Sequence, residues 1–437
     1  MFEHDSTYDL IVRNAYLTNH DAVLDIAVDG QFIVAIDEDL EAAAAEEINA
    51  NGNLVGPGFV DSHMHIDKSF AACGERQPKG NDTAFNFREI MPREEEYFTH
   101  ATVEDVMTNA LRDIEMAVAA GTTYIRTHVA INHETFGLQN VEAVTRARNA
   151  ASHLADIQLV PAARNIPSQA SFQMLGEAIE RGQLDQDESL SELPFAEPVL
   201  VGGSDPAGSN KNIEGTLDAW FSLAVKYDVG LDVHIQDGST LGGYTLDRLF
   251  EYIETNDFDG RVTASHCYCL SHLPDWQIEK LINRFNETDT NVVTCYQSTR
   301  PTMPVRTLLE EGITLAHGTD NDRDFVFPHG NADSLEGALI ESNKLHGDRD
   351  FVDDYRWFDS NQGLAHLWKM ITTHGANALG IENNYQIEVG NPATFVVFDE
   401  PSPQWAIISQ ATRRYVVKDG IIIAEDGEIC PEHSVSN

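Results

Sequence analysis

The chain has 437 residues, which exceeds the usual length of one domain but suits a large parallel α/β barrel with a small accessory domain. Its 28 Lys and Arg against 71 Asp and Glu give a formal net charge of −43, which excludes a nucleic-acid-binding protein or one attracted to anionic membranes. Because 42% of the residues are hydrophobic and the acids are spread along the whole chain, we interpret the protein as globular, with the acidic surface of a halophilic protein; a merely acidic mesophilic protein is the alternative.

Cysteine usage and the amino terminus indicate the compartment. The five cysteines are odd in number and form no Cys-x-x-Cys pair, so we expect no structural disulfide. The first residues lack the basic and apolar regions of a secretory signal, and no window approaches the ~20 apolar residues that cross a bilayer. We therefore predict a cytoplasmic protein that acts on a small molecule, has no nucleic-acid or membrane partner, and assembles as a homo-oligomer.

Short strands with turn signals begin the chain. Residues 10–13, 26–28 and 32–36 are rich in apolar and β-branched side chains, and Asp29-Gly30 is typical of a hairpin turn. The Ala- and Glu-rich residues 41–47 predict a short helix or a turn. Similar strand-like segments return at residues 394–398, 415–418 and 421–424. We therefore expect strands from both ends of the chain to share one sheet in a small β-sandwich domain.

Apolar strands alternate with helical segments in the middle of the chain, which is the order of a (β/α)8 barrel. The eight predicted strands are residues 54–60, 124–129, 158–161, 199–203, 231–234, 262–266, 292–295 and 314–317. We expect residues 1–56 and 385–437 to form the β-sandwich domain and residues 57–384 to form the barrel. Two longer irregular regions, residues 71–98 and 165–190, follow barrel strands and are predicted to be substrate loops.

The most informative segment is Gly56-Pro-Gly-Phe-Val-Asp-Ser-His-Met-His-Ile-Asp-Lys, where His63 and His65 follow a buried strand. Side chains in a strand alternate between faces, so both imidazoles point the same way and can share a metal ion. A His-x-His pair alone is weak evidence, and ordinary surface histidines are the alternative. The other predicted strands end in further polar residues: His128, Arg164, Asn165, Asp205, His234, His266, Gln297 and Asp320.

These polar side chains converge, because the carboxyl ends of parallel strands meet at one face of a barrel. His63, His65, His234 and Asp320 supply a nitrogen and oxygen set that suits one divalent ion, Zn²⁺ or Fe²⁺, with a position left for water. Such an ion lowers the pKa of water towards about 7. Asp320 can both bind the ion and accept the proton.

Six motifs in order along nearly the full length resemble the amidohydrolase superfamily, specifically its cytosine deaminase branch and the N-isopropylammelide amidohydrolase type. They are Gly58-Phe-Val-Asp-Ser-His-Met-His-Ile-Asp-Lys, Arg126-Thr-His-Val, Val233-His-Ile-Gln-Asp, Thr263-Ala-Ser-His, Gly318-Thr-Asp-Asn and Arg413-Arg-Tyr-Val-Val-Lys-Asp-Gly. The resemblance implies one metal ion held by the four ligands above. It also implies that His266 orients and polarises the attacking water, and that Asp237 passes a proton to a ring nitrogen.

Two-metal members of that superfamily carry a carbamylated lysine on a barrel strand. The strand in question reads Gln158-Leu-Val-Pro-Ala-Ala-Arg-Asn and has no lysine, so one metal ion is favoured over two.

The chain also departs from the family pattern. Asp237 stands where the pattern has Glu, so its carboxylate reaches about one methylene less far. Arg164 occupies the position of a glutamine that reads the pyrimidine amide in cytosine deaminases, and a guanidinium suits a carbonyl-rich or anionic ring better. Asn321 replaces a second aspartate. Lys68 is shared with the N-isopropylammelide type, and we expect it to contact a substrate carbonyl or an acid such as Asp205.

Some of these residues have plainer interpretations. Asp205 can simply initiate a turn, and His128 is either an inward-facing donor to the site or part of the packing at the barrel floor. Cys267 and Cys269 are more typical of small core residues than of thiolate ligands.

We predict a metal-dependent hydrolase that cleaves a C–N bond of a cyclic amidine, such as an aminopyrimidine or aminotriazine, and releases ammonia or an alkylamine. The expected catalytic residues are Asp320, His266, Asp237 and Lys68, and the expected substrate-binding residues are Arg164, Asp205, Asn321 and Lys68. The alternatives are hydrolysis of a cyclic amide or an N-acyl group, and a catalytically inactive barrel that binds a ligand.

Overall fold

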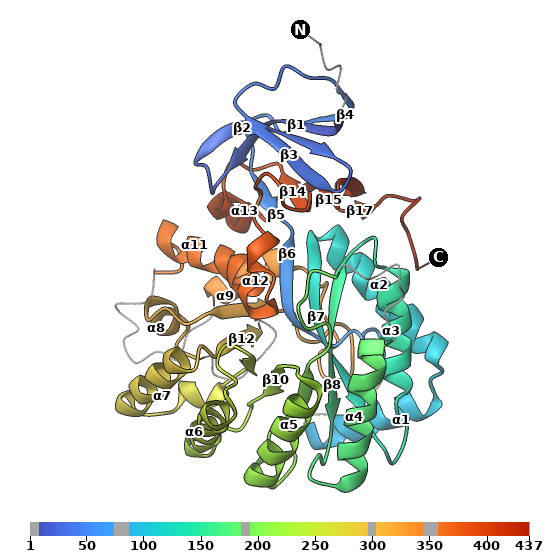
Figure 1. Ribbon diagram of the computed structural model, residues 1–437, viewed down its shortest axis with the longest axis vertical. Helices are drawn as coiled ribbons and strands as arrows, with labels where there is room; N and C mark the ends of the chain where they lie inside the picture. The colour runs from blue at the N-terminus through green and yellow to red at the C-terminus, as the bar shows by residue number, and fades with distance from the viewer. Residues whose placement is uncertain (1–7, 74–86, 185–192, 296–302, 344–356, 437) are drawn as a thin grey trace.

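The computed structural model describes residues 8–73, 87–184, 193–295, 303–343 and 357–436, which form a barrel with a smaller β-sandwich above it (Figure 1). Eight parallel strands make up the barrel sheet in chain order. They are β6 (Phe59–Met64), β7 (Thr122–Ile131), β8 (Asp156–Ala163), β9 (Val201–Ser204), β10 (Leu231–His234), β11 (Val262–Ser265), β12 (Asn291–Cys295) and β13 (Leu315–Gly318). All eight correspond to strands expected from the sequence, so the (β/α)8 prediction is confirmed.

The barrel closes where β13 meets β6. The backbone N–H of Asp320 donates to the carbonyl of His63 at 2.8 Å, and Met64 pairs with Asp320 as a parallel bridge. Gly318 permits this approach, because a Cβ there would lie 2.5 Å from the Cβ of His63. Closure of the sheet therefore sets Asp320 beside the histidines of the first strand.

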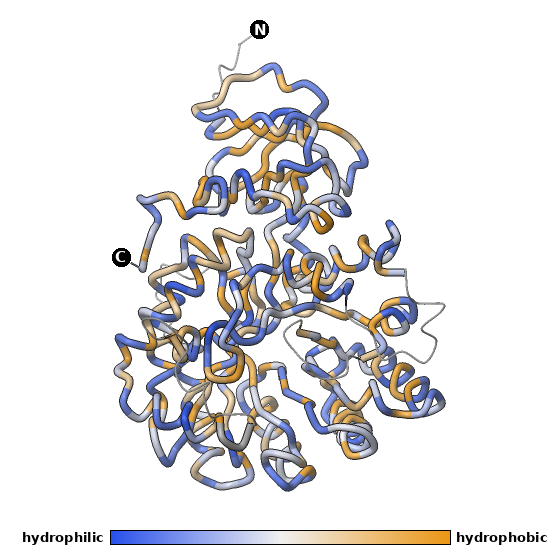
Figure 2. The backbone as a smooth tube through the Cα atoms, turned by 180° about the vertical axis from the view of Figure 1, so that it is seen from behind, coloured by the Kyte–Doolittle hydropathy of each residue, from blue (hydrophilic) through white to orange (hydrophobic). Residues whose placement is uncertain are grey.

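Amphipathic helices surround the barrel sheet. In α2 (Val103–Ala119), Thr102 and Asp105 form a capping box at the start, and the inward face buries Val106 and Ile114. Figure 2 shows hydrophilic and hydrophobic residues alternating along the helices, as expected for helices that cover a sheet with one face. The other helices are α3 (Gln139–Ala150), α5 (Ile213–Tyr227), α6 (Ser239–Asn256), α7 (Asp275–Glu287), α8 (Val305–Glu310), α9 (Ser334–Asn343), α11 (Asn361–Met370), α12 (Thr373–Leu379) and α13 (Pro403–Ser409). Two short 3₁₀ turns are η2 (Tyr268–Ser271) and η3 (Glu382–Asn384), and two further helices are α1 (Phe87–His100) and α4 (Gln169–Leu184).

Two regions expected to be irregular contain helices instead. α1 (Phe87–His100) overlaps the end of residues 71–98, and α4 (Gln169–Leu184) lies within residues 165–190. Pro92 inside α1 and the glycines of α4 lower helix propensity, which is why the sequence did not indicate these helices. In α4, tertiary packing requires a glycine: a Cβ at Gly182 would lie 2.7 Å from the side chain of Val199.

The two ends of the chain form a β-sandwich of two sheets, and strands from both ends share one of them, as expected, because β5 pairs with β14. One sheet has the order β3-β2-β1-β4 and the other β17-β16-β15-β14-β5. The strands are β1 (Tyr8–Leu17), β2 (Ala22–Asp29), β3 (Phe32–Asp37), β4 (Ala44–Asn49), β5 (Val55–Pro57), β14 (Phe395–Phe398), β15 (Arg413–Lys418), β16 (Ile421–Glu425) and β17 (Glu428–Ile429). Ile26, Val28 and Phe395 belong to one buried core to which both sheets contribute. The prediction of a helix or turn at residues 41–47 is wrong, because β4 pairs in parallel with β1 there.

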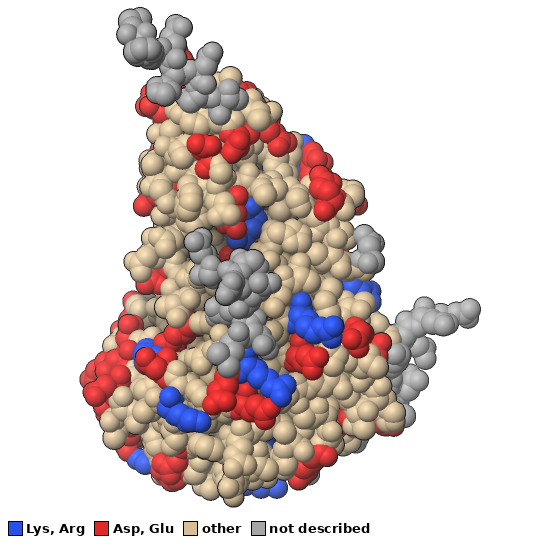
Figure 3. Space-filling model, turned by 45° about the vertical axis from the view of Figure 1, so that its right-hand side comes forward, with Lys and Arg blue, Asp and Glu red and all other residues tan. Residues whose placement is uncertain are grey.

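The surface is as acidic as the composition requires. Figure 3 shows carboxylates dispersed over both the barrel and the sandwich, with fewer basic side chains among them. Among the described residues, none of the helices combines the length and apolar character that crossing a membrane requires.

Candidate metal centre

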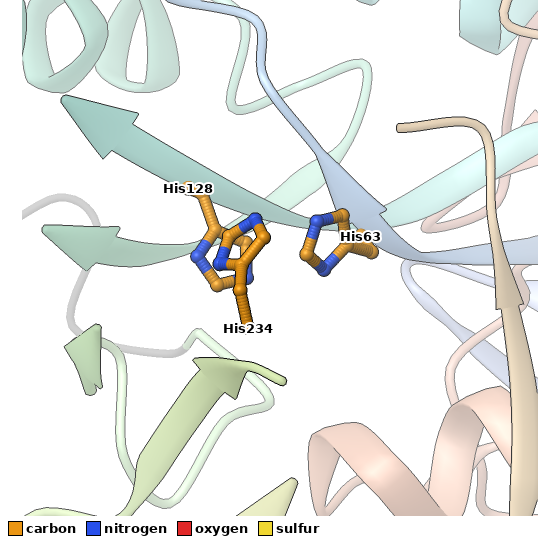
Figure 4. A group of neighbouring side chains, drawn as sticks. All are labelled: His63, His128 and His234. Atoms are coloured by element: carbon orange, nitrogen blue, oxygen red, sulfur yellow. The ribbon is translucent and has the colours of Figure 1, made fainter. Parts of the chain in front are cut away.

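Imidazoles from three barrel strands meet inside the carboxyl end of the barrel. Figure 4 shows His63 of β6 facing His128 of β7 and His234 of β10. The ring centroid of His63 lies 4.2 Å from that of His128 and 4.7 Å from that of His234. His65, just beyond the end of β6, stands 5.2 Å from His63. The two histidines of the His-x-His segment therefore share one face of the strand, as the alternation of side chains predicts.

The donor atoms of His63, His65 and Asp320 lie within 4.8 Å of one another, as ligands to one ion can, and His234 approaches this group through His65. Two atoms that each lie about 2.0–2.1 Å from a tetrahedral ion are about 3.3 Å apart. Nε2 of His65 is 3.3 Å from Nε2 of His234 and 3.3 Å from Oδ1 of Asp320. Nε2 of His63 is 3.8 Å from the same oxygen of Asp320. Three members of the predicted nitrogen and oxygen set therefore lie together, and the fourth, His234, lies beside His65.

The remaining ring nitrogens are held by the protein, which fixes how the imidazoles are oriented. Nδ1 of His234 lies 3.1 Å from the carbonyl of Gly203, and Nδ1 of His63 lies 3.1 Å from the hydroxyl of Ser265. Because the carbonyl can only accept, His234 carries its proton on Nδ1 and presents a bare Nε2. Nε2 of His63 is buried and has no hydrogen-bond partner among the described residues. An orphaned nitrogen aimed at a cluster of donors fits a metal ion.

Burial lowers the pKa values of His63, His65 and His234 well below their ordinary value, and repulsion from neighbouring cationic groups adds to the effect. These imidazoles are therefore neutral at physiological pH, which is the form that binds metals.

Asp232, two residues before His234 on β10, links several of these groups. Its carboxylate accepts a hydrogen bond from the hydroxyl of Ser265 at 2.8 Å and one from Arg126 at 3.0 Å. Nε2 of His128 lies 3.3 Å from Oδ1, the carboxylate oxygen that accepts from Ser265. Although burial opposes ionisation, His128, Arg126 and Ser265 hold the pKa of Asp232 below its ordinary value. Since the Ser265 hydroxyl donates to Asp232, it accepts from His63 and so selects the His63 tautomer with a bare Nε2.

Left-handed backbone at the strand ends directs several side chains inward. His266 has φ 74° and Cys267 has φ 40°, so the alternation of β11 breaks and both Ser265 and His266 face the barrel interior. Asp320 has φ 66° immediately after β13. Non-glycine residues with positive φ are uncommon and concentrate at functional sites. Cys295, at the end of β12, completes a second cluster of ligand-type atoms with His63 and His266.

A cavity of about 330 Å³ opens above this cluster. Its polar wall contains Lys68, whose ammonium lies 3.5 Å from Glu94 and 3.8 Å from Asp324. Arg164 continues the wall with ion pairs to Glu94 at 3.2 Å and to Glu95 at 3.1 Å. The apolar part of the lining is Met91, Ala130, Ile131, Phe136, Ala162, Val326 and Phe327.

The structure places most predicted residues at this cavity. His65, Lys68, Arg164, Asp205, His234, Asp320 and Asn321 line it. Nδ2 of Asn321 has no hydrogen-bond partner among the described residues, so it can donate to a ligand. His266 packs behind His63 and His234, and the lining residue next to it is Tyr268, whose hydroxyl lies 3.3 Å from Nδ1 of His266.

Two predicted residues make contacts other than those expected. The Asp237 carboxylate accepts from the backbone N–H groups of Ala207 and Gly208 at 3.3 and 3.2 Å, and it is not among the residues that line the cavity. Lys68 does not pair with Asp205, because Glu94 and Asp324 are its acidic neighbours and Asp205 accepts from the backbone of Gln236. Gln297, predicted at the end of another strand, lies outside the described residues.

Sequence reasoning missed several residues of the site. Asp232 could have been found, because it precedes His234 by two positions in a strand and so shares its face. Glu94 and Asp324 carried no local signal, since one lies on α1 and the other on the loop after β13. Ser265 could not be assigned to the site, because regular strand alternation would place it on the face opposite His266, and the positive φ of His266 breaks that alternation.

Comparisons with known proteins place the chain in a family. A model described as "Amidohydrolase family" matches residues 54–430. The chain is 42% identical over 419 residues to the N-isopropylammelide isopropyl amidohydrolase of Pseudomonas sp. (strain ADP), with 96% of this chain and 98% of that protein covered. It is 24% identical over 395 residues to the pterin deaminase of Rhizobium rhizogenes (strain K84 / ATCC BAA-868), covering 85% of this chain and 80% of that protein.

Two solved structures share the fold along almost the whole chain. N-isopropylammelide isopropylaminohydrolase from Burkholderia multivorans ATCC 17616 superposes with a TM-score of 0.82 at 26% identity, covering 97% of this chain and 100% of that one. 5-Methylcytosine deaminase from Klebsiella pneumoniae, liganded with 5-fluorocytosine, superposes with a TM-score of 0.78 at 22% identity, covering 95% and 97%. The second likeness shows the fold alone.

Proposed function

Because the chain belongs to the amidohydrolase family, we propose that it is a metal-dependent hydrolase that releases ammonia or an alkylamine from an amino-substituted heterocycle. The observation that carries this proposal is the proximity of the His63, His65 and Asp320 donor atoms, with His234 beside His65, next to a cavity that His65, His234 and Asp320 line. The 42% identity to a protein named for N-isopropylammelide supports an aminotriazine as the first substrate to test.

We propose that these four side chains hold one divalent ion, Zn²⁺ or Fe²⁺, since the donors are imidazole nitrogens and a carboxylate oxygen. When bound, the ion would supply Lewis-acid chemistry, which lowers the pKa of water and polarises the bond under attack. Ser265 and Gly203 hold His63 and His234 in the tautomers that such an ion requires.

The protein's own groups then divide the proton transfers. Asp320 takes the proton from the attacking water and returns it to a ring nitrogen, because its carboxylate lies at the base of the cavity. His266, backed by the Tyr268 hydroxyl, orients the water. Lys68 and the free amide Nδ2 of Asn321 donate hydrogen bonds to ring carbonyl oxygens. Asp237 has no part in this scheme, because its carboxylate holds the loop at Ala207 and Gly208 instead.

The substrate must leave the surrounding water to reach these groups. The apolar side chains that line the cavity, Met91 and Phe327 among them, suit a flat ring and a small alkyl substituent on the departing nitrogen. We also propose that the acidic surface adapts the protein to concentrated salt, in which carboxylates keep it hydrated and long-range repulsion is screened.

The proposal is tested with metal-free protein reconstituted separately with Zn²⁺, Fe²⁺ and Mn²⁺ in molar KCl. Each form is incubated with aminotriazines, aminopyrimidines and pterins, and ammonia and alkylamines are quantified. We expect amine release from at least one class, together with loss of both metal binding and turnover in His65→Ala. Ring opening without amine release would favour cyclic amide hydrolysis, and binding without any turnover would favour an inactive barrel.

A further inference from the structure

Helix α1 places a buried glutamate in the wall of the cavity, between two cations. The Glu94 side chain is 4% exposed. One carboxylate oxygen, Oε1, accepts from Arg164 at 3.2 Å, and the other, Oε2, lies 3.5 Å from the ammonium of Lys68. Lys68 and Glu94 both line the cavity together with His65 and Asp320, so the glutamate stands where the edge of a bound ring must pass.

Carboxylates outnumber cations in this wall of the cavity. Lys68 and Arg164 face three carboxylates: Glu94, Glu95 and Asp324. An anionic ring would therefore meet cations that are already neutralised, and it would also meet the buried charge of Glu94. Of the two ring types that Arg164 was expected to suit, carbonyl-rich or anionic, the anionic one does not fit this arrangement. A neutral ring fits better.

The two inner groups nevertheless retain hydrogen-bonding capacity. Oε2 of Glu94 is buried and has no hydrogen-bond partner among the described residues. Both ion pairs of Lys68, at 3.5 and 3.8 Å, are longer than the 2.7–2.9 Å of a charge-assisted hydrogen bond. Although burial opposes the charge, Glu94 and Asp324 raise the pKa of Lys68, so its ammonium remains a donor. The wall thus offers one acceptor and one donor side by side.

We propose that Glu94 and Lys68 read the lactam edge of the substrate, a ring N–H adjacent to a ring carbonyl. The ring N–H donates to Oε2 of Glu94, and the neighbouring carbonyl accepts from the Lys68 ammonium. This inference rests on the proposed function and narrows its substrate class to neutral oxo-heterocycles that carry such an edge. Arg164 does not touch the ring; it positions Glu94, and Glu95 holds Arg164 from the solvent side.

The test compares two rings on the metal-loaded full-length protein in molar KCl. One is N-isopropylammelide, and the other is its derivative methylated at the lactam nitrogen, which cannot donate to Glu94. We expect the wild-type protein to prefer the N–H ring by about 10- to 100-fold in kcat/KM, the effect of leaving a buried charged group unpaired. Glu94→Gln keeps a weaker acceptor, and Glu94→Ala removes the acceptor and makes room for the methyl group. The preference should therefore fall stepwise from wild type to E94Q to E94A, where it nears unity.

Glu96→Ala is the matched control, because Glu96 lies two residues from Glu94 on α1 but is exposed and is not among the residues that line the cavity. E96A should retain the preference for the N–H ring. Equal cleavage of both rings by the wild-type protein, or a full preference in E94A, would overturn the inference. If no ring releases an amine, the proposed function fails, and the ratio of the two dissociation constants, measured by calorimetry, still tests whether Glu94 reads the N–H.

Discussion

Replacement of Ser265 by alanine tests whether the contacts behind the ligands set metal affinity. The Ser265 hydroxyl connects Nδ1 of His63 at 3.1 Å to the carboxylate of Asp232 at 2.8 Å, and all three groups are buried. Without it, the proton of His63 can occupy either nitrogen, and a metal ion must bind the tautomer with a bare Nε2. The chain loses one buried hydrogen bond to a ligand, a cost of about 1–3 kcal/mol. Since 1.4 kcal/mol is a factor of ten, we expect the metal dissociation constant to rise about 10- to 100-fold.

The assay is Zn²⁺ competition against a chromophoric chelator, with the unfolding temperature of the metal-free protein as a check on folding. Ser62→Ala is the matched control: Ser62 is equally buried and adjoins His63, but its hydroxyl has no hydrogen-bond partner among the described residues. An S265A affinity within about twofold of wild type, or an equal loss in S62A, would refute the reasoning, because the hydroxyl link to Asp232 would then contribute nothing specific.

Three further predictions concern the fold around the site. Gly318→Ala should weaken both metal affinity and thermal stability, because the new Cβ would lie 2.5 Å from that of His63. The control Gly238→Ala should change neither, because no atom lies within 4 Å of the Cβ it would add. Thermal denaturation and chelator competition measure both quantities, and equal effects of the two substitutions would contradict the prediction. Burial raises the pKa of Asp113 to about 7, so the folded protein keeps a proton that the unfolded chain releases near pH 4, and the free energy of unfolding falls as pH rises between these values. Asp113→Asn should flatten that decline in urea titrations of metal-free protein, whereas parallel curves for both proteins would show that Asp113 does not titrate in this range. Finally, the net charge of −43 predicts an unfolding temperature that rises between about 0.1 M and about 2 M KCl, and calorimetry showing no rise would argue against self-repulsion as a destabilising force.

The sequence predicted those parts of the molecule that local periodicity determines. Each barrel strand is an apolar run with a polar residue at its carboxyl end. Because the strands are parallel, those ends meet at one face of the barrel. His63, His65, His234 and Asp320 could therefore be grouped without coordinates. The strand at Ala44–Asn49 could not be predicted from the sequence. Its Ala- and Glu-rich residues favour a helix, and only the parallel pairing with β1 makes the segment extended.

The residues proposed to determine specificity could not be predicted from periodicity. Glu94 enters the cavity from a helix that contains a proline, and its partners, Lys68 and Arg164, lie 26 and 70 residues away in the chain. No periodicity connects such positions, since their approach depends on how α1 lies across the barrel mouth. The contacts of Asp237 could not be predicted for a related reason: its carboxylate comes three residues after His234, but the backbone amides of Ala207 and Gly208 donate hydrogen bonds to it.

The contacts that close the barrel also bring together residues of the proposed metal centre. The N–H of Asp320 donates to the carbonyl of His63, Gly318 packs on the same residue, and Asp61 accepts from the backbone of both His63 and Thr319. An ion held by His63 and Asp320 would add a further link between β6 and β13, so it should bind the closed barrel far better than any state in which these strands separate. Binding to the folded state alone raises the free energy of unfolding. The ligands are thus encoded by the same strand ends that complete the fold, which is why they can be inferred from sequence, whereas a wall residue such as Glu94 can change without disturbing closure and is free to differ with the substrate.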